Sequence, residues 1–179
     1  MLPPMSPNQP GAGTQPAKVA DRRIRVKSAA DMRRLGLVLG RTLAIGDVIA
    51  LSGPLGAGKT TLVQGLAEGL GVPAWRHVAS PTFSLVNQHV GRIDFVHVDF
   101  FRIRNPAELH ELGLQETFDN AATAIEWADR FPDQLPEDVL QLTLALAPRE
   151  QRIVHVECRG SRSEALAAAL LANWPSSGD

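Results

Sequence analysis

The sequence lacks the features that define several broad classes of protein. It contains no tyrosine and a single cysteine, Cys158, which excludes an internal disulfide and favours a reducing compartment. The longest run of apolar residues, 165–172, is far shorter than the roughly 20 residues that span a membrane. The first 20 residues contain no apolar segment of the kind found in secretory signals. We therefore expect a soluble, cytoplasmic protein that does not engage a membrane.

An excess of charge of one sign is also missing. The 18 lysines and arginines nearly balance the 19 acidic residues, so the net charge is −1. This balance predicts no strong attraction to nucleic acid, although it leaves a local basic patch open. The five histidines are scattered without the spacing of metal ligands, which argues against a zinc site.

What is present is a phosphate-binding motif, GPLGAGKTT, at residues 53–61. Its glycines let backbone N–H groups turn toward phosphate oxygens, its lysine adds a cation for the β- and γ-phosphates, and its first threonine can ligate Mg²⁺. A buried strand over 47–52 and a helix over 60–70 flank the motif, so the helix N-terminus faces the phosphates. The residues expected to bind the nucleotide here are Gly53, Gly56, Ala57, Gly58, Lys59, Thr60 and Thr61.

The rest of the chain predicts one domain over 21–179, preceded by a disordered tail at 1–20 that is rich in proline and glycine. Predicted strands are 24–27, 47–52, 93–100, 121–127, 139–146 and 152–157, with a broken extended stretch at 78–86. Predicted helices are 29–43 with Ser28 as N-cap, 60–70, 106–112 and 163–174, and residues 87–92 form a loop or hairpin turn with Gly91 at positive φ. This pattern predicts a three-layer α/β, P-loop NTPase-like domain with a mixed sheet, parallel around the motif and antiparallel toward the C-terminus.

Acidic residues end two of the predicted strands. Asp99 follows the apolar segment 95–98, and Glu126 follows 124–125. If both strands run parallel to the strand before the motif, both carboxylates reach the edge of the sheet where such folds bind ligands. There they would supply the second Mg²⁺ ligand or the water-orienting acid that a P-loop needs. The alternative for each is an ordinary polar residue leaving a sheet. His97 lies on the same strand face as Asp99, either touching the site or as a hydrogen-bonded strand histidine.

Other charged residues allow two interpretations. Glu108 and Glu111 fit a solvated helix face. Most surface arginines contact neither phosphate nor tRNA. The candidates for such a contact are Arg102, Arg104, Arg130, Arg149 and Arg152.

Five segments follow one another with a characteristic order and spacing: the phosphate loop, SPTFSLV at 80–86, HVDFFR at 97–102, ELHELGLQE at 108–116 and IEWADR at 125–130. In this order and spacing the sequence resembles the TsaE family (also called YjeE), bacterial ATPases needed to make N6-threonylcarbamoyladenosine in tRNA. The resemblance runs from about residue 24 to 159, and the combination of SPT, HxDxxR and IEW is what makes it specific. One departure is Phe101, which replaces a tyrosine common before the arginine of HxDxxR.

The resemblance implies roles for individual residues. Lys59 and Thr60 would bind phosphate and Mg²⁺, Glu126 would ligate the metal, and Asp99 would fill the Walker B position. Lys59, Asp99 and Glu126 are thus the expected catalytic residues, with Thr60 and Glu126 as metal ligands. Thr82 would sit where a switch segment senses the γ-phosphate. The stretch at Ser28 and Ala29 would lie near the adenine.

The resemblance also implies what the protein does. It would be a weak Mg²⁺-dependent ATPase that acts on the threonylcarbamoyl transferase and its inactive paralogue (TsaD- and TsaB-type proteins), and so on tRNA indirectly. It would not transfer the group itself.

Three alternatives use the same loop. A small-molecule or nucleotide kinase usually needs an acceptor region and an arginine-bearing lid, and no compact arginine-rich insert is evident. A GTPase switch needs N-K-x-D and D-x-x-G, which the sequence does not contain. A nucleotide-dependent binding module would hydrolyse ATP negligibly. It differs from the predicted ATPase only in the rate of ATP hydrolysis when the partners are present.

Overall fold

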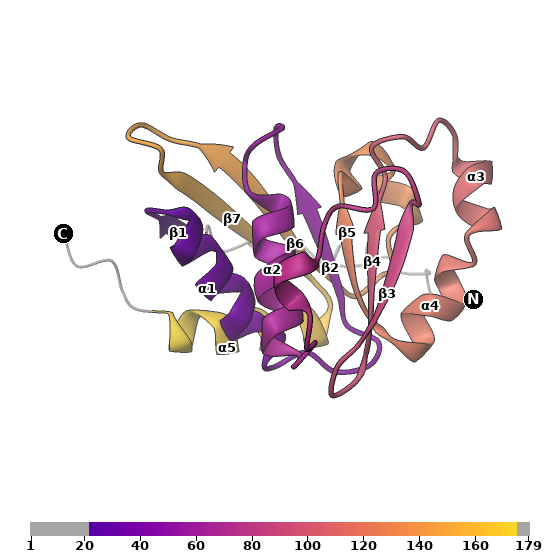
Figure 1. Cartoon of the computed structure of the whole chain (residues 1–179), viewed down its shortest axis with the longest axis horizontal. Coiled ribbons are helices and arrows are strands. Elements are labelled where there is room, and N and C mark those ends of the chain that lie inside the picture. The colour runs from indigo at the N-terminus through magenta and orange to yellow at the C-terminus, as the bar shows by residue number, and fades with distance from the viewer. Residues whose placement is uncertain (1–21, 175–179) are drawn as a thin grey trace, which may run out of the picture.

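The structure is a computed structural model that describes residues 22–174. Within that range seven strands form one sheet in the order β1-β7-β6-β2-β5-β4-β3 (Figure 1). The strands are β1 (Arg22–Val26), β2 (Val48–Ser52), β3 (Val86–Val90), β4 (Asp94–Asp99), β5 (Ala122–Glu126), β6 (Val139–Leu146) and β7 (Arg152–Arg159). Strands β6, β2, β5 and β4 are parallel, whereas β3, β7 and β1 each pair antiparallel with a neighbour. The predicted mixed α/β sheet is therefore confirmed.

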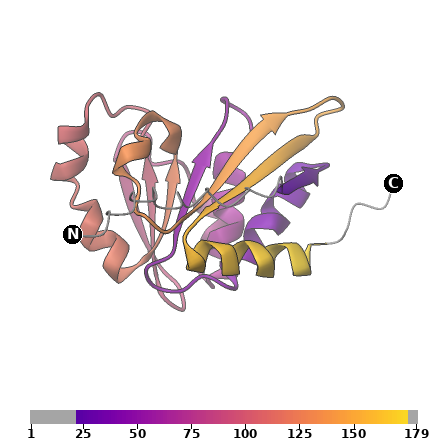
Figure 2. The same cartoon turned by 180° about the vertical axis from the view of Figure 1, so that it is seen from behind.

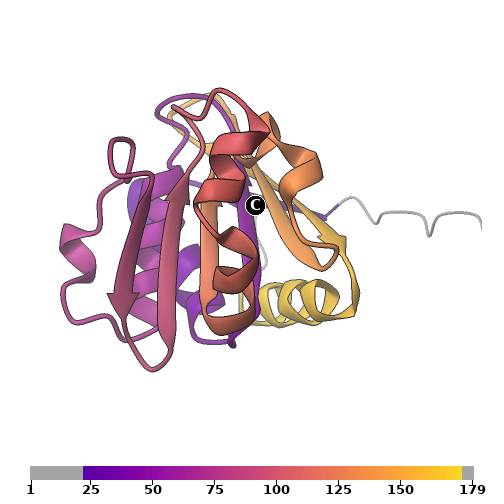
Figure 3. The ribbon, with the colours of Figure 1, turned by 90° about the vertical axis from the view of Figure 1, so that its right-hand side faces the viewer.

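Helices cover both faces of this sheet. The helices are α1 (Ala29–Gly40), α2 (Lys59–Gly69), α3 (Pro106–Glu111), α4 (Leu114–Asn120) and α5 (Ser161–Asn173), with short 3₁₀ turns η1 (Trp75–His77), η2 (Ala128–Arg130) and η3 (Pro132–Gln134). Figure 3 shows α1 and α2 on one side of the sheet and α3 and α4 on the other. One apolar cluster joins α1, α2 and α5 to the sheet, and another joins α3 and α4 to the opposite face of β2, β4 and β5. This is the three-layer arrangement that buries an apolar core on each face.

Helices α1 and α2 pack backbone against backbone because glycines face each other across their contact. A Cβ added at Gly36 would lie 2.1 Å from the carbonyl oxygen of Leu62, and one at Gly65 would lie 2.0 Å from that of Arg33. Glycine within a helix costs about 1 kcal/mol relative to alanine, so close packing is its physical reason here. This packing fixes α1 directly beside the helix that follows the phosphate loop.

The segment before β4 differs from the sequence prediction. The sequence predicts a loop or hairpin turn over 87–92, but Val86–Val90 is strand β3, paired with β4. Conversely, the sequence predicts an extended stretch over 78–86, but residues 82–85 form a turn and a bend. Gly91 does not have positive φ. A glycine is needed there because a Cβ would come within 2.4 Å of the carbonyl oxygen of Leu70.

Helix α4 (Leu114–Asn120) is absent from the sequence prediction. The helix is short and its apolar contacts to the core come mainly from Leu114 and Phe118, which are buried. Two buried positions are too few to produce a recognisable helical period. Packing against β5 therefore defines this helix, not its local sequence.

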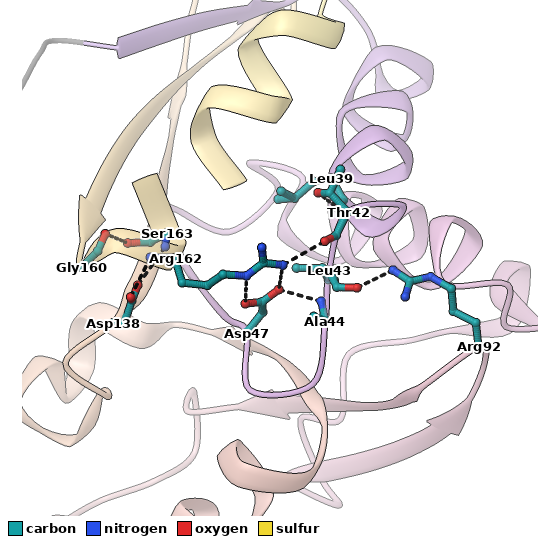
Figure 4. A network of polar contacts seen from close by, with 10 residues as sticks. All are labelled: Leu39, Thr42, Leu43, Ala44, Asp47, Arg92, Asp138, Gly160, Arg162 and Ser163. Carbon is teal, nitrogen blue, oxygen red and sulfur yellow. Dashed lines mark hydrogen bonds and ion pairs between the residues drawn. The ribbon is translucent and has the colours of Figure 1, made fainter. Parts of the chain in front are cut away.

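Helix α5 is tied to the amino-terminal edge of the parallel strands by a polar network (Figure 4). Arg162 donates to both carboxylate oxygens of Asp47 at 2.8 Å, and Asp47 is buried just before β2. The carboxylate of Asp138 accepts from the backbone N–H groups of Arg162 and Ser163, both at 2.8 Å, and so caps a helix whose own N-cap residue is Gly160. Figure 2 shows α5 lying below the β6–β7 hairpin.

The predicted tail at 1–20 lies outside the described residues. In the part of the chain from 22 to 174, no helix is long and apolar enough to cross a membrane.

Candidate functional site

The site lies where the parallel strands end. Strand β2 runs directly into the phosphate loop, β5 ends at Glu126 and β4 ends at Asp99. In the sheet register Asp99 is opposite Glu126, and Glu126 is opposite Leu51. Both acids therefore reach the carboxyl edge of the sheet beside the loop, which is the placement that their positions at strand ends predict.

The loop takes a conformation that its glycines allow. Gly53 has φ 136° and Gly58, which precedes α2 as its N-cap, has φ 106°. Side chains are strained at such angles, whereas glycine is not. The loop and the N-terminus of α2 border a cavity of about 380 Å³. Its lining comes from four segments of the chain and comprises Leu55, Gly56, Gly58, Lys59, Thr60, Thr61, Ser80, Thr82, Asp99, Phe101, Glu126 and Trp127.

Glu126 is the acid that contacts α2, the helix that follows the phosphate loop. The Thr60 hydroxyl donates to Glu126 Oε1 at 2.8 Å, and His97 Nε2 lies 2.9 Å from the same oxygen. Glu126 is 3% exposed, so its carboxylate is held by these neighbours more than by bulk water. A threonine hydroxyl and a carboxylate in contact are hard oxygen donors of the kind that Mg²⁺ prefers. The residues present therefore fit a magnesium ion.

Asp99 is used differently. Its Oδ2 accepts hydrogen bonds from the hydroxyls of Ser80 and of Thr82, the latter at 3.0 Å, and its Oδ1 accepts from the backbone N–H of Phe101 at 2.7 Å. Asp99 is 1% exposed. It thus anchors the Ser80–Thr82 segment to the sheet edge.

Lys59 is buried without an ion-pair partner among residues 22–174. Its ammonium group donates to the carbonyl oxygens of Gly53 at 2.7 Å and Pro54 at 3.1 Å. It also lies 3.7 Å from the centroid of the Trp127 ring. Burial lowers the pKa of Lys59, and the nearby carboxylates, Glu126 foremost, only partly offset this effect. A bound anion would relieve the desolvation of this charge.

A further cavity of about 440 Å³ lies on the other side of the loop. Ser28 and Ala29 at the start of α1 line it. The turn of the β6–β7 hairpin lines it as well, with Arg149 and Glu150 both at φ 59°. The remaining lining residues are Lys27, Met32, Gly56, Ala57, Gly58, Thr61 and Arg152.

Arg152 joins this hairpin to the phosphate loop. Its guanidinium donates to the carbonyl oxygens of Ala57 at 3.2 Å and Gly56 at 3.1 Å. The sequence singles out Arg152 only as a candidate phosphate or tRNA contact. The structure shows that it binds the backbone of the loop, a contact between positions 95 apart in the chain that no local pattern indicates.

Trp127 and Ser80 are site residues that the sequence pattern alone does not single out. Trp127 covers Lys59 and takes left-handed backbone angles with φ 58°, which a non-glycine residue adopts at a cost. Ser80 contacts Asp99. Both fall inside segments that carry the resemblance, IEWADR and SPTFSLV, and that was the available signal.

Three of the arginines considered as phosphate contacts, Arg102, Arg104 and Arg130, lie away from the cavity beside Lys59. Arg130 donates to the carbonyl oxygen of Ile103 at 3.0 Å, and Arg102 stacks over the Phe83 ring at 4.8 Å. Neither they nor Arg104 line the cavity beside Lys59 and Thr60. The described part of the chain therefore brings no arginine to that cavity.

The sheet order, the loop after β2 and the acids at the ends of β4 and β5 define a P-loop NTPase-like α/β domain. The family model described as "Threonylcarbamoyl adenosine biosynthesis protein TsaE" matches residues 26–154. The chain belongs to this TsaE family.

Individual relatives agree with this assignment. A protein from Treponema pallidum named tRNA threonylcarbamoyladenosine biosynthesis protein TsaE is 37% identical over 131 residues, 73% of this chain and 96% of the relative. A protein of the same name from Bacillus subtilis is 39% identical over 127 residues, 70% of this chain and 78% of the relative. The crystal structure of YdiB from Bacillus subtilis superposes with a TM-score of 0.72 at 27% identity, covering 88% of this chain and 98% of that one.

Proposed function

We propose that the protein binds ATP with Mg²⁺ at the carboxyl edge of the sheet and hydrolyses it slowly. The observation that carries this proposal is the contact between Thr60 of the phosphate loop and the strand-end carboxylate of Glu126, 2.8 Å apart. It joins the two groups that a P-loop enzyme needs on one metal ion. The cavity bordered by these residues also presents Lys59 and the N-terminus of α2 to an anion.

Each residue then has a task in the reaction. Lys59 and the N–H groups of the loop would hold the phosphates, and Thr60 and Glu126 would hold Mg²⁺, which would supply positive charge to stabilise the transferring phosphoryl group. Asp99 holds Ser80 and Thr82 beside the cavity, so that the Thr82 segment can respond to the γ-phosphate. Ser28 and Ala29 line the cavity that suits the nucleoside.

We further propose that this ATPase serves the synthesis of threonylcarbamoyladenosine in tRNA. The family to which the chain belongs bears that name, and so do the relatives. The protein would act on the threonylcarbamoyl transferase and its inactive paralogue, and the ATP cycle would reset that complex between turnovers. The group transfer itself belongs to the partners, and tRNA is reached only through them.

Two features support activation by the partner complex. The cavity beside Lys59 has no arginine in its lining among the described residues, and an arginine supplied in trans raises the rate of related phosphoryl transfers by roughly 10³–10⁵. Leu55 and Phe101 line this cavity yet are exposed, and Phe83, next to Thr82, is 86% exposed. Exposed apolar side chains at the mouth of a site are typical of a surface that a partner covers.

Phosphate release at saturating ATP, with and without the purified transferase–paralogue complex, tests the coupling. We expect slow release by the protein alone and at least tenfold faster release with the complex. Equal rates would discard partner activation. Depleting the protein should lower threonylcarbamoyladenosine in tRNA nucleosides measured by mass spectrometry. An unchanged level would remove the pathway assignment.

The variants Glu126→Gln and Asp99→Asn test the division of labour between the two acids. We expect Glu126→Gln to lose Mg²⁺-dependent hydrolysis while keeping nucleotide binding, since the metal stabilises the transition state more than the ground state. Asp99→Asn should retain metal-dependent binding and lose rate. The reverse pattern would exchange the roles of the two residues.

A further inference from the structure

We propose that His97 is a positioning residue for the candidate metal site: its imidazole fixes the Glu126 carboxylate for Mg²⁺. The inference rests on the proposed function, because it assigns the group that orients a proposed ligand. His97 lies on β4, two residues before Asp99 and therefore on the same strand face.

The geometry is that of a metal ligand, Glu126, and a side chain, His97, that orients it through a hydrogen bond. His97 Nε2 lies 2.9 Å from Glu126 Oε1, which also accepts from Thr60 at 2.8 Å. The donors come from the strand next to β5 and from the helix after the phosphate loop, so they approach one carboxylate oxygen from different elements. Two donors on one oxygen restrict the rotation of the carboxylate group. Glu126 then presents its carboxylate to the cavity in one orientation.

The complete burial of His97 indicates that its polar ring is present for the hydrogen bond to Glu126. His97 is 0% exposed, and its Nδ1 is among the buried polar atoms of the described chain that lack a hydrogen-bond partner. An unpaired buried polar group costs about 1–3 kcal/mol, so packing alone would favour an apolar side chain at this position. Phe95, two residues earlier on the same strand face, is fully buried in an apolar cluster, so this face of β4 accommodates an apolar side chain. The hydrogen bond to Glu126 is the contact that only a polar side chain of this length supplies.

Outer contacts of this kind tune metal affinity. Replacing the group that orients a metal ligand typically lowers metal affinity by roughly 10–100-fold. The effect at His97 should therefore appear in metal binding and not in contacts of the nucleotide that do not involve metal. This separates a positioning role from a purely structural one.

The test measures the affinity of Mn²⁺, as a spectroscopic substitute for Mg²⁺, by electron paramagnetic resonance with the full-length protein and saturating ADP. We expect His97→Leu to weaken Mn²⁺ binding by about tenfold. Affinity for fluorescent ADP in EDTA should change less than twofold. His97→Gln places an amide N–H near the position of Nε2, so it should restore most of the Mn²⁺ affinity.

Thr123→Val is the matched control, because Thr123 is a fully buried polar residue on the adjacent strand β5 and its hydroxyl also lacks a partner among residues 22–174. It should leave Mn²⁺ affinity unchanged. Wild-type Mn²⁺ affinity in His97→Leu would overturn the inference. Equal losses in His97→Leu and His97→Gln, or a loss in EDTA as large as the loss with metal, would also overturn it. Failure of the wild type itself to bind ADP or Mn²⁺ would instead remove the proposed function. If His97→Leu does not fold, His97→Asn replaces it, because its shorter side chain cannot place an amide N–H at the position of Nε2. A metal-specific loss in His97→Asn with near-wild-type Mn²⁺ affinity in His97→Gln supports the donor role, whereas equal Mn²⁺ affinities in these two variants contradict it.

Discussion

At the amino-terminal edge of the parallel strands, the buried carboxylate of Asp47 accepts two hydrogen bonds from Arg162 and one from the backbone N–H of Ala44. At the carboxyl edge, the ammonium group of Lys59 is equally buried but meets only carbonyl oxygens and the Trp127 ring. At the amino-terminal edge the buried carboxylate of Asp47 has an ion-pair partner in Arg162. At the carboxyl edge the buried ammonium group of Lys59 has no ion-pair partner among residues 22–174. The same sheet therefore carries one edge whose buried charge is paired within the protein and one edge whose buried ammonium group has no ion-pair partner among the described residues.

The physical difference lies in what completes each charge. A buried carboxylate beside an arginine is satisfied within the protein. A buried lysine without a carboxylate partner retains part of its desolvation penalty, which lowers its pKa. Phosphate would supply the missing charge only when bound. The two edges should thus respond oppositely to mutation, one losing stability and the other losing affinity.

The largest expected effect comes from replacing Lys59 by an apolar side chain of similar length. Lys59→Met should weaken ATP binding by roughly 100-fold, because it removes charge-assisted hydrogen bonds to phosphate. Without nucleotide the variant should be at least as stable as the wild type, since a buried unpaired charge is gone. Calorimetric titration gives the affinity and chemical denaturation the stability.

The pH dependence of this difference has a defined sign. The pKa of Lys59 is lowered in the folded protein. Between this lowered pKa and the ordinary lysine pKa, the unfolded chain therefore binds more protons than the folded protein does, and stability rises with pH. The wild type should therefore gain stability relative to Lys59→Met over that range. Arg25→Met, at an exposed cation on β1, is the control and should change neither quantity. Clear destabilisation of nucleotide-free Lys59→Met would break the comparison between the edges.

The next effect is at the opposite edge. Arg162→Ala should lower the free energy of unfolding by about 2 kcal/mol, because the buried carboxylate of Asp47 loses its ion pair while the half-exposed position of Arg162 lets water replace part of it. ATP affinity should remain within twofold of wild type. Thermal denaturation and titration of the same samples measure both. Arg25→Ala should change stability by less than about 0.5 kcal/mol. An ATP affinity that falls together with stability would show that the two edges are not independent.

The smallest effect concerns the cap of α5. Asp138→Ala should cost about 1 kcal/mol at neutral pH, because the backbone N–H groups of Arg162 and Ser163 lose their acceptor. Partial burial opposes ionisation of Asp138, but these hydrogen bonds outweigh it and hold its pKa below the ordinary value. The stabilisation is therefore complete above the unfolded pKa of about 3.9 and is lost as pH falls through the lower folded value.

Denaturation curves from pH 7 down to pH 3 check this pH dependence. The difference between wild type and Asp138→Ala should shrink at the acid end. Asp138→Asn keeps one side-chain oxygen and should recover part of the loss at neutral pH. A difference that is constant with pH would mean that the ionised carboxylate is not what caps the helix.

Local sequence determined the parts of this protein that depend on neighbours in the chain. The glycines of 53–58 set the loop, Ser28 caps α1 by accepting from the N–H of Asp31, and Pro106 opens α3 behind its N-cap Asn105. Apolar runs that end in Asp99 and Glu126 placed both acids at strand ends. In each case the physical cause acts within a few residues, so the pattern of residues is sufficient.

Tertiary structure decided whatever depends on residues far apart in the chain. It brings Thr60 within hydrogen-bond distance of Glu126, and Ser80 within hydrogen-bond distance of Asp99. These contacts form because β5 lies next to β2 and β4 lies one strand further out. It turned 86–90 into a strand by pairing it with β4, and it placed Trp127 on Lys59. Pairing partners and ring contacts depend on the folded path of the chain, and the same local sequence is compatible with several paths. The sequence thus determined which chemical groups are present at the edge of the sheet, and only the fold decided which of them touch.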